Sequence, residues 1–110
     1  MRKAWPLLLI SVLMLAACGK PVPPDKAAYV GEWKSPSMAL VITQDGRVAY
    51  KRVKGSSTTS VDGPLQKFEG SNFVVGIPYL TTTFEVSKAP YEQDGRWRMV
   101  VDGVELTKGR

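Results

Sequence analysis

Turn-forming residues interrupt the chain at short intervals from Tyr29 onward, which leaves no room for a long helix. Glycines that follow acidic residues include Gly46, Gly70, Gly95 and Gly103. Between these glycines, apolar side chains recur at every second position, which is the period of a strand with one buried face. The pattern therefore predicts short antiparallel strands joined as hairpins.

The clearest hairpin surrounds Asp102-Gly103, a dipeptide typical of two-residue type I′ turns. Such a turn pairs Val101 with Val104. The apolar residues of both strands then share one face, whereas a slip by one residue would exchange the two faces. The residues expected on this apolar face are Trp97, Met99, Val101, Val104 and Leu106.

Two further hairpins follow from the same reasoning. A three-residue loop ending at Gly46 sets Ile42 opposite Val48, with Gly46 in the left-handed conformation. A Gly-Ser turn further along the chain sets Phe68 opposite Phe73. Since each hairpin has one apolar face, the sequence predicts an all-β domain, which is a small antiparallel barrel or sandwich of about seven or eight short strands.

Other segments follow the strand pattern less closely. Strands are expected over 29–34 and 81–86. A three-residue loop at 93–95 would place Tyr91 opposite Trp97, which is a favourable aromatic pair across two strands.

A basic and polar segment follows Tyr50. Lys51 and Arg52 suit a phosphate or an anionic sugar, or they form a solvated strand end. Residues 54–64 are rich in Ser, Thr and Gly, so we expect a mobile surface loop there. An edge strand over 58–61 is the alternative.

The first seventeen residues have a different character from the rest. Arg2 and Lys3 give a positive start, and residues 7–15 are almost entirely apolar. This apolar stretch is too short to span a bilayer, which needs about 20 helical residues. A positive start, a short apolar core and small residues at the end are typical of a signal peptide, here 1–17.

The end of this segment, Leu15-Ala16-Ala17-Cys18, resembles the lipobox of bacterial lipoproteins. The resemblance implies cleavage before Cys18, a diacylglycerol on the Cys18 sulfur and an acyl chain on the new amino terminus. Several acyl chains anchor a protein stably in a membrane. Gly19 follows where inner-membrane lipoproteins carry aspartate, so we expect the periplasmic face of the outer membrane if the organism is Gram-negative.

Residues 18–28 are expected to be a flexible tether between the lipid and a β domain over 29–110. Three prolines at 21, 23 and 24 favour an extended polyproline II geometry, which would hold the domain away from the membrane.

The composition excludes most familiar catalytic chemistry, because the chain has no histidine and one cysteine. Cys/His metal sites, Ser-His-Asp triads and internal disulfides cannot form. We expect no metal, no cofactor apart from the acyl chains on Cys18, and no enzymatic activity. Arg2 and Lys3 account for two of the 15 basic residues, which leaves thirteen against 10 acidic ones beyond the signal segment. This mild excess suits an anionic envelope partner rather than a nucleic acid.

Gly31-Glu32-Trp33 is similar to the Gly-x-Trp opening of lipocalin-like barrels, in which the tryptophan closes one end. The whole chain also resembles the small envelope lipoproteins of Proteobacteria, which implies location rather than activity. The candidates for contact with a ligand or a partner are Trp33, Tyr50, Lys51, Arg52 and Trp97. For the aromatic side chains among them, the alternative that we favour is a place in the core of the domain.

Three functions remain open at this point. The first is a non-enzymatic interaction module for an envelope protein or a cell-wall polymer, tethered to the membrane by lipid. The second is a lipocalin-like binding module for a lipid or another small amphipathic molecule, which needs an internal pocket. The third is an inhibitor of a cell-wall hydrolase, which needs a protruding segment such as 54–64.

Overall fold

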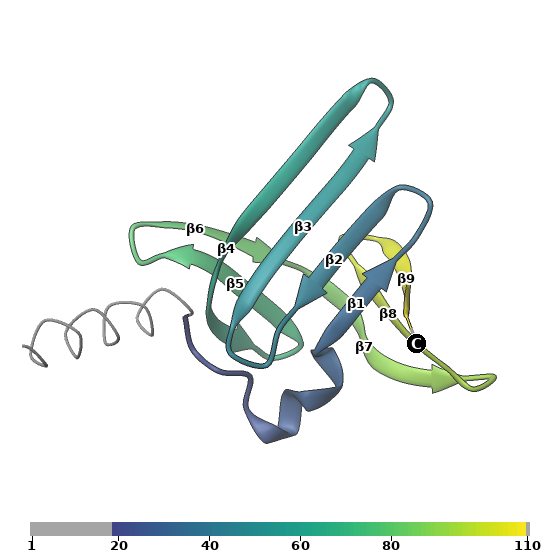
Figure 1. Cartoon of the computed structure of the whole chain (residues 1–110), viewed down its shortest axis with the longest axis horizontal. Helices are drawn as coiled ribbons and strands as arrows, with labels where there is room; N and C mark the ends of the chain where they lie inside the picture. Colours follow the sequence, from purple (N-terminus) through teal and green to yellow (C-terminus); the bar gives the residue numbers. More distant parts are fainter. Residues whose placement is uncertain (1–18, 110) are drawn as a thin grey trace, which may run out of the picture.

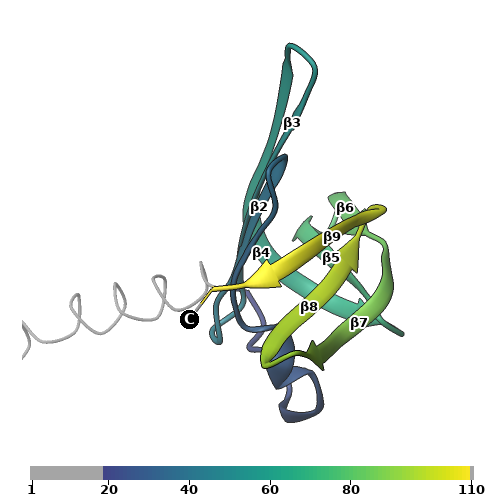
Figure 2. The ribbon, with the colours of Figure 1, turned by 90° about the vertical axis from the view of Figure 1, so that its right-hand side faces the viewer.

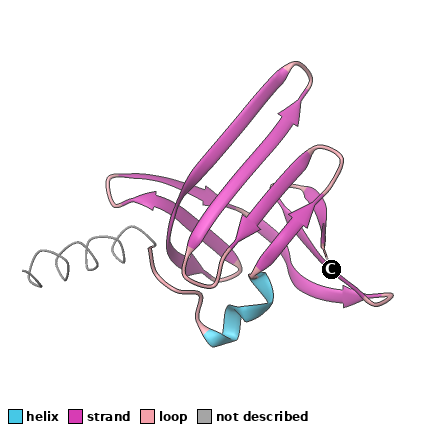
Figure 3. Cartoon of the chain, viewed as in Figure 1, coloured by secondary structure: helices cyan, strands magenta, loops and turns pink. Residues whose placement is uncertain are grey.

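The computed structural model describes residues 19–109 (Figure 1). The elements, in chain order, are the 3-10 helix η1 (Pro24–Tyr29) and the strands β1 (Gly31–Lys34), β2 (Met38–Ile42), β3 (Arg47–Lys54), β4 (Ser57–Glu69), β5 (Asn72–Ile77), β6 (Leu80–Phe84), β7 (Val86–Gln93), β8 (Arg96–Val101) and β9 (Val104–Lys108). Strands make up most of the described chain (Figure 3). The expected signal peptide 1–17 and the expected lipidation at Cys18 lie outside the described residues.

The strands form one antiparallel sheet in the order β6-β5-β4-β3-β2-β1-β9-β8-β7. The two ends of this order, β6 and β7, are consecutive in the chain and are separated only by Glu85. One bent segment therefore pairs with β5 through its first half and with β8 through its second half. The sheet curls into a half-barrel, with β7, β8 and β9 turned away from the plane of β2 and β3 (Figure 2). The predicted small antiparallel all-β fold is confirmed.

Hydrogen bonds with Asp102, in the turn between β8 and β9, and with Asn72, the first residue of β5, hold the bend at Glu85. The amide of Glu85 donates to Oδ1 of Asp102 at 3.0 Å, and the amide of Asp102 donates to the carbonyl of Glu85 at 2.8 Å. The amide of Val86 donates to Oδ1 of Asn72 at 2.7 Å. Because side chains satisfy the amides of Glu85 and Val86, the strand expected over 81–86 is divided in two at the bend.

The concave face of the sheet carries the core, and the predicted registers place it there. Val101 pairs with Val104 and Ile42 pairs with Val48; Val101, Ile42 and Val48 belong to the core, and Val104 packs against it. Phe68 pairs with Phe73, as expected. The fully buried large side chains are Trp33, Phe73, Phe84, Leu40, Ile42, Leu65, Met99 and Leu106.

The turns around Asp102-Gly103 and Asp94-Gly95 have the same geometry. Both residues of each pair have a positive φ, at 48° and 80° for the first and 54° and 77° for the second, as type I′ turns require. The first turn was predicted correctly. The loop expected at 93–95 has two residues rather than three, so the pairing moves by one position. Glu92, and not Tyr91, therefore lies opposite Trp97.

The loop expected over 54–64 is wrong, because these residues continue a long hairpin. Lys54 pairs with Ser57 across a tight turn, and the ladder between β3 and β4 continues as far as Arg47 and Pro64. The alternative of an edge strand over 58–61 is closer, although β4 is an inner strand of the sheet. Threonine suits a strand exposed on both faces, and β3 supplies the hydrogen bonds that a loop would lack.

The extended tether expected over 18–28 is also wrong for its described part. Residues 24–29 form η1, and Val22 is buried in the core. The amide of Val22 donates to the carbonyl of Gln44 at 2.9 Å, and Nε2 of Gln44 donates back to the carbonyl of Val22 at 2.8 Å. The hydroxyl of Tyr29 donates to the carbonyl of Ser71 at 2.8 Å and thereby fixes the end of η1. Packing of one apolar side chain and these bonds outweighs the polyproline preference of the segment.

Candidate functional site

Two of the aromatic candidates belong to the core rather than to a binding surface. Trp33 on β1 is fully buried, and its indole N–H donates to the carbonyl of Tyr29 at 2.9 Å. Tyr50 on β3 is buried with its ring centroid 4.7 Å from that of Phe84. Phe84 in turn stacks on Phe73 with a centroid distance of 5.0 Å. These side chains fill the concave face of the sheet, so they stabilise the domain and offer no surface to a ligand.

Trp97 is the second residue of β8, and its side chain is 36% exposed. The ammonium group of Lys108 lies 5.6 Å from the ring of Trp97 and 4.9 Å from the ring of Trp33. The same group donates a hydrogen bond to the carbonyl of Ala28 at 2.8 Å. Burial lowers the pKa of Lys108 from its ordinary value, because the charged form loses water contacts. Lys108 thus connects β9 to η1 and β1, a role that only the pairing of distant strands could indicate.

Lys51 and Arg52 lie next to each other on β3 but on opposite faces of the hairpin, since neighbouring residues of a strand alternate in direction. Lys51 is opposite Ser60 and Arg52 is opposite Thr59. The structure therefore brings both to the projecting hairpin without joining them in one pocket. Lys54 continues this basic character to the end of β3.

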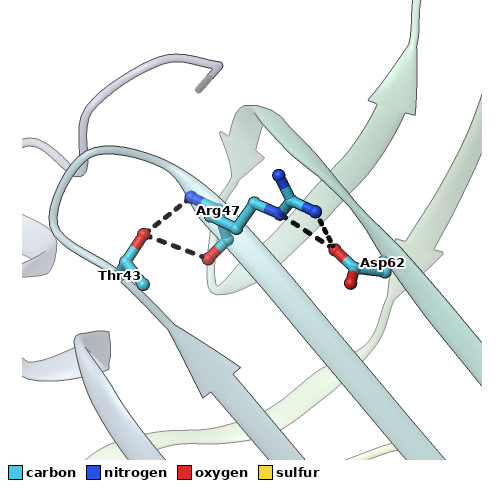
Figure 4. A network of polar contacts seen from close by, with 3 residues as sticks. All are labelled: Thr43, Arg47 and Asp62. Atoms are coloured by element: carbon cyan, nitrogen blue, oxygen red, sulfur yellow. Dashed lines mark hydrogen bonds and ion pairs between the residues drawn. The ribbon is translucent and has the colours of Figure 1, made fainter. Parts of the chain in front are cut away.

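Arg47, at the start of β3, is held by its neighbours (Figure 4). Its Nε donates to Oδ1 of Asp62 at 2.9 Å, and Nη2 forms an ion pair with the same oxygen at 2.9 Å. Its backbone amide donates to Oγ1 of Thr43 at 2.9 Å. Because the charge of Arg47 is already balanced by Asp62, the basic residues of the hairpin that lack such an ion pair partner among the described residues are Lys51, Arg52 and Lys54, which lie towards its outer end.

An apolar turn that sequence reasoning missed joins β5 and β6. Tyr79 is 87% exposed and Leu80 is 72% exposed, and the preceding Ile77 is partly exposed. Turns usually carry polar residues, so the succession Ile-Pro-Tyr-Leu was the available signal. A surface hollow of about 380 Å³ next to this turn is lined by residues that include Lys20, Lys67 and Pro78.

A second hollow, of about 480 Å³, lies between the amino-terminal segment and β4. Its lining includes Lys20, Lys26 and Phe68. Lys26 donates to the carbonyl of Gly70 at 2.9 Å and lies 5.6 Å from the ring of Phe68. The two hollows share Lys20, Gln66 and Lys67, and both are open to the surface.

In the part of the chain that the structure describes, no helical segment has the length and the apolar character needed to cross a membrane. Over residues 19–109, no three acidic, cysteine or histidine side chains come close enough together to hold a metal ion.

Comparison with known proteins gave no match to a family model, to a curated protein or to a solved structure.

Proposed function

We propose that this chain is a lipid-anchored envelope protein whose β domain is a non-enzymatic interaction module. The lipobox-like Leu15-Ala16-Ala17-Cys18 supports the anchor, and Gly19 supports the periplasmic face of the outer membrane in a Gram-negative organism. The partner in this proposal is an envelope protein or a cell-wall polymer with negative charge.

The projecting hairpin of β3 and β4 is the observation that carries the proposal. β2 accompanies β3 only as far as Arg52, and β5 joins β4 only from Leu65 onward. The outer part of the hairpin therefore extends beyond the rest of the sheet (Figure 1, Figure 2). A two-stranded ribbon with both faces in water is only marginally stable by itself, so a partner that covers it would stabilise it.

The charge of the hairpin indicates the kind of partner. Lys51, Arg52 and Lys54 are followed by Ser, Thr and Gly, and no acidic residue occurs between 51 and 61. Val53, which is 46% exposed, adds an apolar contact on the same face as Lys51. The basic side chains of β3 face hydroxyl side chains of β4 across the ladder. This combination suits the phosphates or carboxylates of a cell-wall polymer, or an acidic surface on a protein.

The filled interior supports an interaction module over a carrier. A lipocalin-like carrier holds its ligand inside the barrel, and in this domain Trp33, Phe73 and Phe84 occupy that space. The hollows described above are open to the surface, where an amphipathic ligand would stay largely in contact with water.

Photocrosslinking in living cells tests the proposal. A photoreactive amino acid replaces Ser56 in the turn between β3 and β4, and a matched variant carries it at Asp94 in the turn between β7 and β8. Both positions are exposed, so neither substitution disturbs the core. We expect a specific crosslinked product from position 56 and none from position 94. Equal products, or none at either position, would contradict a partner at the hairpin.

A second candidate follows from the same hairpin, which is the protruding segment that an inhibitor of a cell-wall hydrolase requires. Inhibitors of this kind insert a projecting segment into the substrate cleft. Addition of the purified domain to a muramidase digest of peptidoglycan tests this directly. Inhibition is supported if the domain slows the digestion and if the variant with Lys51→Glu and Lys54→Glu no longer slows it. If the domain leaves the digestion rate unchanged, that muramidase is excluded as a target.

A further inference from the structure

The amino-terminal segment leaves no spacer between Cys18 and the folded domain. A side chain at Gly19 would come within 2.7 Å of Cβ of Pro64 and 2.8 Å of the carbonyl oxygen of Gly46. The amide of Lys20 donates to the carbonyl of Leu65 at 3.1 Å. Since consecutive Cα atoms are about 3.8 Å apart, an acyl chain on Cys18 would leave directly from the surface of the domain.

The turn between β5 and β6 lies on this same side of the molecule. Lys20 and Pro78 line one hollow, so the start of the domain and the turn are neighbours. Figure 1 shows the turn on the left, beside the point where the described chain begins. The hairpin of β3 and β4 points away from this side.

Tyr79 and Leu80 are the two most exposed large hydrophobic side chains of the described residues. Gly76 has a φ of 127°, and a side chain there would overlap the backbone of Leu80, so the turn closes tightly. A tyrosine combines an apolar ring with a polar hydroxyl and is typical of the membrane–water boundary. Leucine beside it adds apolar area that water does not solvate favourably.

Charged side chains line the hollow next to the apolar turn. They are Lys20, Lys67 and Glu69, and Lys67 forms an ion pair with Glu69 at 3.0 Å. Lys20 therefore supplies the net positive charge beside the turn, and an apolar projection beside a basic group suits the interface of an anionic bilayer.

We infer that Tyr79 and Leu80 insert into the headgroup region of the membrane that holds Cys18, and that the domain therefore lies directly on the bilayer. The inference rests on the proposed anchor. It makes the turn between β5 and β6 a second membrane contact, and it directs the basic hairpin of β3 and β4 away from the lipid.

A fluorescent label at position 80 tests the contact. The full chain with Leu80→Cys is produced in bacteria, where acylation of Cys18 leaves the new thiol as the free one. The labelled protein is reconstituted into vesicles of phosphatidylcholine and phosphatidylglycerol that contain a spin-labelled quencher lipid. Ser56→Cys, in the turn of the distant hairpin, is the matched control.

We expect blue-shifted emission and severalfold stronger quenching for the label at position 80 than for the label at position 56. Equal quenching of the labels at positions 80 and 56 would overturn the membrane contact. The mass of the intact protein shows separately whether Cys18 is acylated. An acylated chain with a water-exposed label at position 80 overturns this inference alone, whereas an unacylated chain overturns the proposed anchor as well.

Discussion

The backbone amide of Lys20 donates a hydrogen bond to the carbonyl of Leu65 at 3.1 Å, which joins the start of the described chain to the middle of the sheet. This bond and those of Val22 make the proline-rich segment a part of the domain. A lipid on Cys18 would then fix the orientation of the domain as well as its location.

Hydrogen exchange tests this integration of the amino-terminal segment. The amides of Lys20 and Val22 have backbone acceptors, so we expect them to exchange at least about 100-fold more slowly than unstructured amides. The exposed amide of Ser56 is the internal comparison. NMR spectroscopy follows the exchange of these amides. If the amides of Lys20 and Val22 exchange at the rate of an unstructured peptide, the segment is a flexible tether and not a part of the domain.

Truncation of Trp33 tests the filled interior. Trp33 is fully buried and hydrogen bonded, so Trp33→Ala should lower the free energy of unfolding by about 3–5 kcal/mol. Trp97 is 36% exposed, and Trp97→Ala should cost about 1–2 kcal/mol. Urea unfolding followed by circular dichroism measures both. Similar losses for the two variants would mean that Trp33 does not hold the core.

Gly76→Ala tests the tight turn between β5 and β6. Its φ of 127° and the overlap of a new side chain with Leu80 should lower the free energy of unfolding by about 2–3 kcal/mol. Gly55 also has a positive φ but nothing within 4 Å of a new side chain, so Gly55→Ala should cost only about 1 kcal/mol. Thermal unfolding compares them, and equal shifts would show that the close approach to Leu80 is unimportant.

The lowered pKa of Lys108 has a consequence for stability at alkaline pH. Below the lowered pKa, Lys108 is charged in both states and the folded state bears the cost of its burial. Between that pKa and the ordinary value of 10.5, the unfolded chain binds more protons, so this contribution to stability rises with pH. Burial raises the pKa of Tyr29, which acts in the opposite direction above its ordinary value of 10.0.

Comparison of variants separates these two contributions. The free energy of unfolding of Lys108→Met, measured against pH in a Tyr29→Phe background, should lack the rise that the Tyr29→Phe protein shows. NMR titration of the Lys108 side chain gives its pKa directly. A pKa of Lys108 at or above the ordinary value of 10.5 would contradict the effect of burial.

Local signals in the sequence predicted the register of three hairpins, which turn at Gly46, Gly70 and Gly103. Asp102-Gly103 and the alternating residues around it contain the turn type and the register together, so Val101 could be paired with Val104. The turn at Asp94-Gly95 has the same chemistry, but Pro90 and an irregular β7 obscured the register there.

Features that depend on distant segments were not predictable in this way. Val22 is buried because Gln44 satisfies its backbone, and nothing near Val22 in the sequence indicates that pairing. Lys108 contacts Trp33 and Trp97 only because β9 pairs with β1. Of the candidate contact residues, Lys51 and Arg52 lie on the projecting hairpin, whereas Trp33 and Tyr50 lie in the core, the place favoured for the aromatic side chains.

Native mass spectrometry of the mature chain, extracted from bacterial membranes in detergent, tests the central claim most directly. The claim is that a solid β domain is attached to lipid through Cys18 and works by surface contact. It predicts a mass increase from acyl chains on Cys18 that survives denaturation, and no small molecule that is released on unfolding. An unmodified Cys18, or a stoichiometric lipid that is lost on denaturation, would contradict it.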